Sequence, residues 1–297
     1  MKTLRLLTFA AVLLALFSAC KEDTSAGLND DGSLCGVFAV SDSTWVAFSR
    51  GNLQYQPSSA TWRFAESQKE TLGRDNENIS SSYTGWIDLF GWGTSGWGSG
   101  AEAYMPYSTS TLSTNYMPGG DTSANLTGIY ANADWGQYNP IENGGNTPGR
   151  WRTLTKDEWT YLLNQRQGAS QKYGLAKIDN VQGLVLLPEG WTLPDGMEFT
   201  PGFENGYKTN RYTGAKWSKM QSAGAVFLPA AGYREEYTVF TKFQGDDGCG
   251  FYWSSTSLSA PNCNILFFGK SAVNPNNFSK RHFGLAVRLV TPTHLLD

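Results

Sequence analysis

A long stretch in the first half of the chain has no regular hydrophobic period. Residues 67–150 are dense in Gly, Ser, Asn, Thr, Trp and Tyr, as in GWIDLFGWGTSGWGSG, and neither a 3.6-residue nor a two-residue repeat persists. A segment of that length without secondary structure either counts against a compact domain or forms functional loops. If the domain is compact, a rigid frame built from the rest of the chain must carry these residues as loops.

Short β-prone runs flank this stretch on both sides. VFAV, TWVAFS, LQYQP and TWRFA precede it, with turn residues between them, and GLVLLP, GAVFLP, GFYWSSTS and NILFFG follow it. In the final run, FGLAVRLV (residues 283–290), large apolar side chains alternate with mostly small ones. Because neither face of that run shows the polar side chains expected of a solvent-exposed face, the run predicts a central strand and not an edge strand.

Two segments predict helices. TLTKDEWTYLLNQR has Thr155 at the N-cap and Glu158 three residues later, which is a capping box, and Trp159, Leu162 and Leu163 then share one face. Residues 214–221, GAKWSKMQ, form a weaker candidate. The chain is therefore predicted to be α+β, with antiparallel sheets, two helices and long irregular loops.

The N-terminus reads as an export signal. Residues 1–19 begin with two positive charges, continue as an apolar run and end in small residues, and the run is shorter than the ~20 residues that span a bilayer. The small residues before Cys20 resemble the lipobox of bacterial lipoproteins, in which the cysteine is acylated. Lys21-Glu22-Asp23 resembles the acidic tag that sends lipoproteins of the Bacteroides group to the cell surface, although it also suits the start of a solvated linker. We expect a signal peptide at 1–19, a lipidated Cys20 with a flexible tether at 20–35, and one domain at 36–297, anchored to the outer membrane and exposed at the cell surface.

Composition excludes some partners. Without residues 1–19 the chain keeps 21 basic and 26 acidic residues, a net charge of −5, and it has no basic run, so nucleic acid is not an expected partner. Cys249 and Cys263 are close in the sequence of an exported protein, which makes a disulfide plausible. A simple hairpin centred near Ala260 would not place them opposite each other, and Cys35 has no predicted role.

Three motifs resemble known families. WRTLTKDEW resembles the helix start of the formylglycine-generating/sulfatase-modifying family, and YWSST followed by HFGLAVRLV resembles its C-terminal end. The same C-terminal motifs, with GAVFLPAAGYR, are more similar to the Fibrobacter succinogenes major paralogous domain family. The resemblance covers residues 36–291 and is strongest from Trp151 onward. It implies a C-type lectin-like (sulfatase-modifying-factor-like) fold, in which the first and last strands pair, two helices flank the sheet, and loops carry the binding site.

The sequence shows no motif for catalysis or for calcium-dependent sugar binding. The surroundings of Cys249 and Cys263 do not match the copper-binding motif of the formylglycine-generating enzymes, and the sugar-binding motifs of calcium-dependent lectins are absent. A Ser-His-Asp site would depend almost entirely on His282, and neighbouring carboxylates such as Glu235-Glu236 do not face each other across a substrate. We therefore expect no cofactor, no metal and no catalytic residues.

The eleven Trp residues favour recognition, because Trp and Tyr present rigid amphipathic faces to sugars and proteins alike. The sequence predicts a surface protein that binds an extracellular glycan or protein. The alternatives are a structural or fimbrial-tip subunit of a surface assembly and, less favoured, a sulfatase-modifying-type enzyme or hydrolase. The candidate ligand-binding residues are Trp86, Trp92, Trp97, Tyr104, Tyr107, Trp217, Tyr233 and Arg234.

Overall fold

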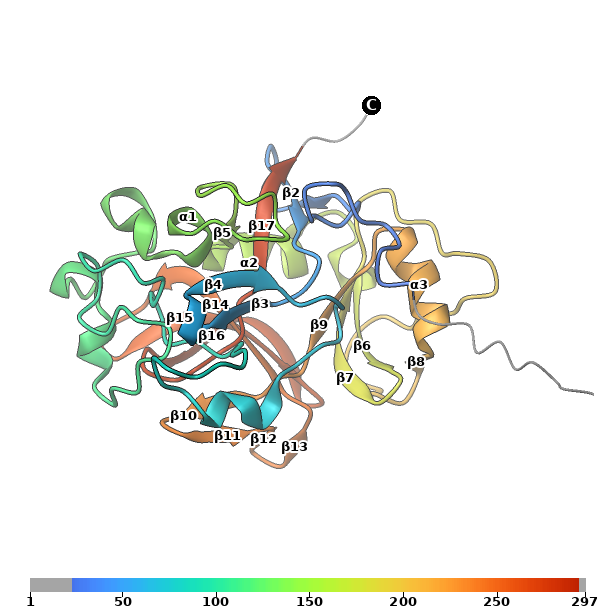
Figure 1. The fold of residues 1–297 in the computed structure, drawn as a ribbon. Helices are drawn as coiled ribbons and strands as arrows, with labels where there is room; N and C mark the ends of the chain where they lie inside the picture. The colour runs from blue at the N-terminus through green and yellow to red at the C-terminus, as the bar shows by residue number, and fades with distance from the viewer. Residues whose placement is uncertain (1–22, 294–297) are drawn as a thin grey trace, which may run out of the picture.

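Most of the sequence after residue 22 forms one set of packed sheets and loops (Figure 1). The computed structural model describes residues 23–293, apart from the side chains of Asp246 and Asp247. The sheets are mostly antiparallel and the helices few, so the predicted α+β class is confirmed. The expected signal peptide and Cys20 lie outside the described residues. Within residues 23–293, no helix is both long enough and apolar enough to cross a bilayer.

The first sheet joins the two ends of the domain. Its order is β1-β2-β17-β5, and antiparallel pairing places Phe48 opposite Val290. The predicted central position of the C-terminal strand is confirmed, but its ladder begins at Leu289, because residues 284–286 form isolated bridges to three other segments. The strands are β1 (Phe38–Ala39), β2 (Trp45–Phe48), β5 (Arg152–Thr153) and β17 (Leu289–Thr293).

The second sheet carries the helix α3. Its order is β8-β6-β7-β9, with one parallel pair, β6 with β8. Trp217 and Met220 of α3 are buried in a cluster with Phe227 of β9, so the predicted helix at 214–221 packs against this sheet. The elements are β6 (Tyr173–Ile178), β7 (Val181–Leu186), β8 (Asn210–Tyr212), β9 (Val226–Pro229) and α3 (Gly214–Ser222).

The third sheet, β14-β15-β16, contains a strand that the sequence did not indicate. β14 and β15 match the two predicted runs, whereas β16 reads AVNPNNFSK, in which Pro275 and the Asn residues obscure any alternation. Three hairpins accompany this sheet. The elements are β14 (Gly250–Ser257), β15 (Asn262–Gly269), β16 (Ala272–Lys280) and the pairs β3 (Leu53–Gln56) with β4 (Thr61–Phe64), β10 (Tyr233–Glu235) with β11 (Thr238–Phe240), and β12 (Lys242–Phe243) with β13 (Asp246–Asp247).

The helix α2 begins where the capping box predicted. Thr155 Oγ1 accepts from the Glu158 backbone N–H at 3.1 Å, and the Glu158 carboxylate accepts from the Thr155 N–H at 2.8 Å. Arg152 adds two hydrogen bonds to the same carboxylate. The helical elements are α1 (Trp135–Tyr138), α2 (Lys156–Thr160), a π turn (Tyr161–Gln165), and 3₁₀ turns at Pro57–Ser59, Gly73–Glu77, Ser113–Tyr116, Pro118–Gly120, Gly128–Ala133 and Ala169–Gln171.

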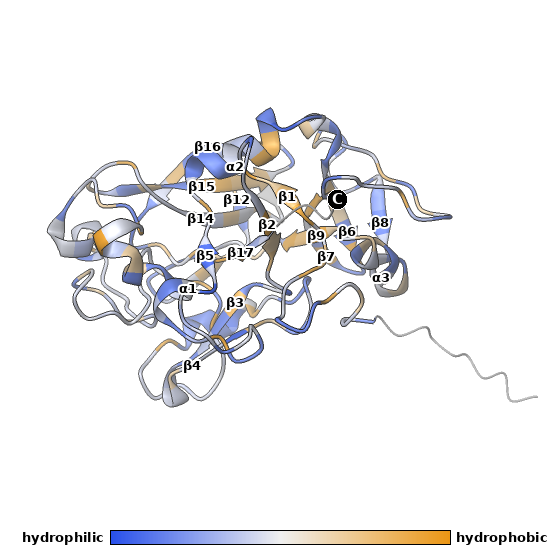
Figure 2. Ribbon diagram, turned by 90° about the horizontal axis from the view of Figure 1, so that it is seen from above, coloured by the Kyte–Doolittle hydropathy of each residue, from blue (hydrophilic) through white to orange (hydrophobic). Residues whose placement is uncertain are grey.

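The aperiodic stretch at 67–150 is ordered and shares an aromatic core with the neighbouring strands. Trp92, Trp135 and Trp151 have no exposed surface and pack with residues of β3, β4, β14 and β15. Figure 2 shows hydrophobic strands at the centre of the molecule, with hydrophilic segments in the loops around them. Much of the Trp content therefore stabilises the loops instead of facing a ligand.

The structure corrects the expectation of a flexible tether for residues 23–35. Leu34 is completely buried, and its N–H donates to the Phe48 carbonyl at 2.8 Å. Leu28 and Leu34 form a β-bridge, and the Asp31 carboxylate pairs with Arg150. Residues 23–35 therefore pack as part of the domain.

Candidate functional site

An apolar pocket of about 430 Å³ lies beside the third sheet, and we call it the aromatic pocket. Strands β10, β12, β14 and β16 and the segment before β17 each contribute an aromatic side chain to it. Such a concave, largely apolar cavity with a few polar groups is typical of binding sites. Its lining residues are Tyr233, Phe243, Phe251, Pro261, Asn262, Phe278, Ser279, Lys280 and Phe283.

Tyr233 is the centre of this aromatic cluster. Its ring lies stacked between those of Phe240 and Phe283, with centroids 5.2 and 5.4 Å away and interplanar angles of 19°. Phe251 and Phe243 contact it edge-on, at 5.4 and 6.3 Å. Stacked and edge-on ring pairs stabilise each other beyond their buried area, so the walls of the pocket are stiff. Burial raises the pKa of the Tyr233 hydroxyl, which therefore stays protonated at neutral pH.

Backbone geometry fixes where Tyr233 lies. Gly232 has φ = +71°, and a Cβ at this position would lie 2.0 Å from the Phe240 carbonyl oxygen, so only glycine fits. Its N–H donates to the Cys249 carbonyl at 3.0 Å. This tight approach brings β10 over β14 and positions the Tyr233 ring.

Arg234 holds this hairpin in place and does not face the pocket. It is 1% exposed, and its guanidinium donates to the carbonyls of Glu236 and Leu89 at 2.6 and 3.2 Å. Its backbone exchanges two 2.8 Å hydrogen bonds with Gly284. Burial lowers the pKa of Arg234 to about 10, so it remains charged at neutral pH. The prediction that Arg234 binds a ligand is wrong, because the side chain is enclosed by protein and its two terminal nitrogens donate to backbone carbonyls.

Three polar side chains lie at the aromatic pocket: Asn262, Ser279 and Lys280. The Lys280 ammonium lies 5.5 Å from the centroid of the Phe283 ring, a cation–π contact. Phe278, next to them in sequence, is 57% exposed. The pocket therefore combines aromatic faces with hydrogen-bonding groups at its edge.

Two of the predicted Trp residues are structural. Trp92 has no exposed surface, and its indole N–H donates to the Ser254 carbonyl at 2.9 Å. Trp217 is 1% exposed and packs between α3 and β9. The prediction that these two rings contact a ligand is wrong, since both are enclosed by protein.

The other predicted residues do not gather with Tyr233. Trp86 is half-buried beneath the Arg63 guanidinium, which lies 3.9 Å from its ring centroid. Trp97 and Tyr107 pack partly against the aromatic core, and Tyr104 is 37% exposed. Of the eight predicted ligand-binding residues, only Tyr233 lines the aromatic pocket.

The possible disulfide between Cys249 and Cys263 is not formed. In the β14–β15 ladder Cys263 lies opposite Ser257, whereas Gly250, the neighbour of Cys249, lies opposite Phe268. The two cysteines are therefore at opposite ends of the hairpin, as its turn position implied.

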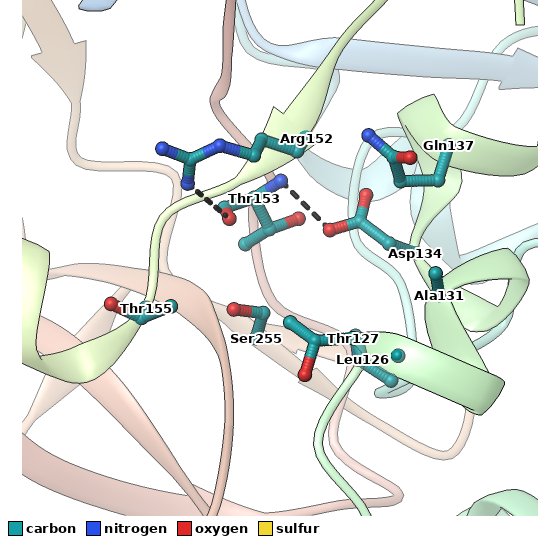
Figure 3. A pocket seen from close by; sticks show the side chains of 10 residues that line it. Leu126, Thr127, Ala131, Asp134, Gln137, Arg152, Thr153, Thr155 and Ser255 are labelled. Atoms are coloured by element: carbon teal, nitrogen blue, oxygen red, sulfur yellow. Dashed lines mark hydrogen bonds between the residues drawn. The ribbon is translucent and has the colours of Figure 1, made fainter. Parts of the chain in front are cut away.

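A second, more polar cavity of about 230 Å³ lies between α1, β5 and α2 (Figure 3). Asp134 lines it, and its carboxylate accepts from the N–H groups of Thr153 at 2.8 Å and Gly136 at 3.1 Å. Arg152 donates to Glu158 and to the Thr153 carbonyl. These hydrogen bonds connect α1, β5 and α2, and the charged side chains that line the cavity already have protein partners.

The described residues form no Ser-His-Asp triad around His282. His282 Nδ1 lies 2.8 Å from Ser113 Oγ, but within residues 23–293 no carboxylate is hydrogen-bonded to the His282 ring to complete a triad. Burial lowers the pKa of His282. In the same part of the chain, no group of three or more His, Cys, Asp or Glu side chains is arranged to hold a metal ion.

Sequence reasoning missed most of the aromatic pocket because it searched for Trp and Tyr in the loops. The aromatic residues of the lining are mainly Phe, contributed by separate segments of the chain, such as Phe243 of β12 and Phe278 of β16. Comparison with known proteins found no matching family model, no similar curated protein and no similar solved structure.

Proposed function

We propose that this chain is the recognition domain of a lipid-anchored surface protein and that its aromatic pocket binds an extracellular glycan. The aromatic pocket is the observation that carries the proposal. Sugar rings stack their C–H faces on aromatic side chains, while Asn262, Ser279 and Lys280 supply hydrogen bonds for hydroxyl groups. A C-type lectin-like fold remains part of this proposal. The pairing of β2 with β17 supports it, because the first and last strands pair in that fold.

A protein ligand is the second candidate, since the pocket would also accept an apolar side chain.

The edge of β16 argues against a partner subunit that donates a strand to this sheet. Pro275 lacks an N–H, and the N–H groups of Asn276 and Phe278 are bonded by the side chains of Asn274 and Asn277 at 2.9 and 2.8 Å. Such capped edges do not accept an added strand.

Replacing Phe278 by Ser tests the glycan site. The mature chain from Lys21 onward, without the acylated cysteine, is first screened on a glycan array. Because Phe278 is 57% exposed, the variant keeps the fold, yet loss of the stacking face is expected to weaken binding about tenfold. Isothermal titration measures the change.

Tyr104→Ser is the matched control, since Tyr104 is an exposed aromatic outside the aromatic pocket. It is expected to bind like the unmodified chain. Equal affinity of the Phe278→Ser variant would place the ligand elsewhere, and a chain that binds no array glycan would favour the protein ligand.

The anchor is a separate part of the proposal and has its own test. Cys20→Ser is expected to abolish incorporation of labelled palmitate and to move the protein from the membrane fraction to the soluble one, because the acyl chains supply the membrane affinity. Labelling that persists in the variant would exclude Cys20 as the acylated residue.

A further inference from the structure

The first described residue is fixed to the surface of α3. The Asp23 N–H donates to Ser218 Oγ at 2.9 Å, and the Ser218 hydroxyl lies 3.3 Å from the Asp23 carbonyl. Gln221, one turn further along α3 and 3% exposed, donates to the carbonyls of Thr24 and Ala26 at 3.2 and 2.6 Å. The chain therefore leaves the domain at the α3 face.

Very little chain separates this face from the proposed anchor. Lys21 and Glu22 are the two residues between Cys20 and Asp23. Three residue steps span at most about 11 Å even when fully extended. An acylated Cys20 would consequently hold α3 about one helix diameter from the lipid headgroups.

The same face carries unpaired positive charge. Lys216 and Lys219 are exposed one turn apart on α3, and exposed Arg211 of β8 lines a small cavity together with Lys216. No carboxylate within residues 23–293 forms an ion pair with any of the three. We call these residues the basic face.

A small polar cavity of about 170 Å³ lies within the basic face. Arg211, Lys216 and Thr209 line it, together with one carboxylate, Glu198. Two cationic groups at one concavity suit a phosphate group, which accepts hydrogen bonds from both.

We propose that the basic face docks on the phosphate headgroups of the membrane that holds Cys20. This inference rests on the proposed anchor. Basic residues close to an anionic lipid surface are attracted to it, and the short link keeps them there. Figures 1 and 2 both place α3 at one end of the molecule and β14–β16 toward the other, so docking would turn the aromatic pocket away from the membrane.

Lysine acetylation on anchored protein tests the orientation. The full acylated protein is reconstituted in vesicles of phosphatidylethanolamine and phosphatidylglycerol, in a ratio of about three to one. Flotation first establishes attachment, and mass spectrometry then measures acetylation of each lysine. Compared with the soluble chain starting at Lys21, labelling of Lys216 and Lys219 is expected to fall about fivefold. Lys280, exposed at the aromatic pocket, is the internal control and should label equally in both.

A charge-reversed variant separates docking from simple proximity. In Arg211→Glu, protection of Lys216 and Lys219 by the vesicles is expected to be lost, whereas Lys270→Glu/Lys280→Glu should keep it. Protein that floats with the vesicles but labels at Lys216 and Lys219 as fast as the soluble chain would overturn the docking and leave the anchor intact. Protein that does not float would overturn both.

Discussion

Replacing Arg281 by Ala is expected to lower the free energy of unfolding by about 3–5 kcal/mol. The side chain has no exposed surface, and its guanidinium donates to the carbonyls of Ser259 and Thr122 at 2.9 and 3.0 Å and to Ser257 Oγ at 2.5 Å. It also lies 4.5 Å from the centroid of the Trp92 ring. The substitution would leave buried acceptors without donors and open a cavity beneath Trp92.

Arg281 connects the loops at 92–122 to the β14–β15 turn, which explains why the loss should be large. Burial lowers its pKa, and no carboxylate of residues 23–293 forms an ion pair with it, so backbone carbonyls, the Ser257 hydroxyl and the Trp92 ring stabilise the charge. Urea unfolding followed by Trp fluorescence measures the change. Arg281→Lys should recover only part of the stability, because an ammonium cannot reproduce the planar fork.

Arg74→Ala is the matched control. Arg74 is 86% exposed and pairs with Glu77 on one 3₁₀ turn, so the expected change is below about 0.5 kcal/mol. A loss of less than about 1 kcal/mol for Arg281→Ala would show that its hydrogen bonds do not fix the loops.

Local signals in the sequence were sufficient for several elements. The capping box at Thr155 and Glu158 uses groups three residues apart, so it can be recognised without tertiary structure. The strands β7, β9, β14 and β15 coincide with apolar runs bounded by Gly, Pro or Asn. The α+β class follows from these elements taken together.

Long-range packing determined what the sequence did not show. Arg234, Arg281 and Arg288 are all at most 1% exposed, and a terminal nitrogen of each donates to a carbonyl or amide oxygen of a distant segment. No local pattern distinguishes such an arginine from a solvated one. For the same reason, composition could not separate the enclosed Trp92 from the partly exposed Trp86.

The candidate site depends on that same packing. The aromatic pocket gathers one aromatic side chain from each of five segments, of which Tyr233 was the one identified from sequence. Residues 23–35 look like a linker because they are small and polar. Two of their backbone carbonyls nevertheless accept hydrogen bonds from the side-chain amide of Gln221. A pairing that spans nearly 200 residues leaves no trace in either segment alone.

Two buried carboxyl groups are expected to make stability depend on pH in an unusual direction. Burial raises the pKa of both Asp88 and Asp134 from 3.8 to about 6. Because the folded pKa is the higher one, the stabilisation from protonation is fully present below pH ~4 and is lost as the pH rises through ~6. The free energy of unfolding should therefore fall between pH ~4 and ~7, by up to about 3 kcal/mol for each group.

Other carboxyl groups set the lower limit of this window. Ion pairs and hydrogen bonds outweigh burial and hold the pKa of Asp31 and Glu189 below their ordinary values. Their stabilisation is present above the unfolded pKa and is lost as the pH falls through the folded one. Maximum stability is consequently expected near pH ~4, and urea unfolding at half-unit intervals of pH would locate it.

Asp88→Asn identifies one source of the slope. The Asp88 carboxylate accepts hydrogen bonds from the Asn76 amide at 2.7 Å and from the Leu72 N–H at 3.0 Å. In Asp88→Asn, the new side-chain NH₂ group would face one of these two donors, which lowers the free energy of unfolding at every pH. Since the variant no longer titrates at this position, its stability should fall less steeply between pH ~5 and ~7. Asp75→Asn, at an exposed position of the same turn, should keep the full slope. An unchanged slope in Asp88→Asn would mean that Asp88 is already ionised at pH 5, its two donors outweighing the cost of burial.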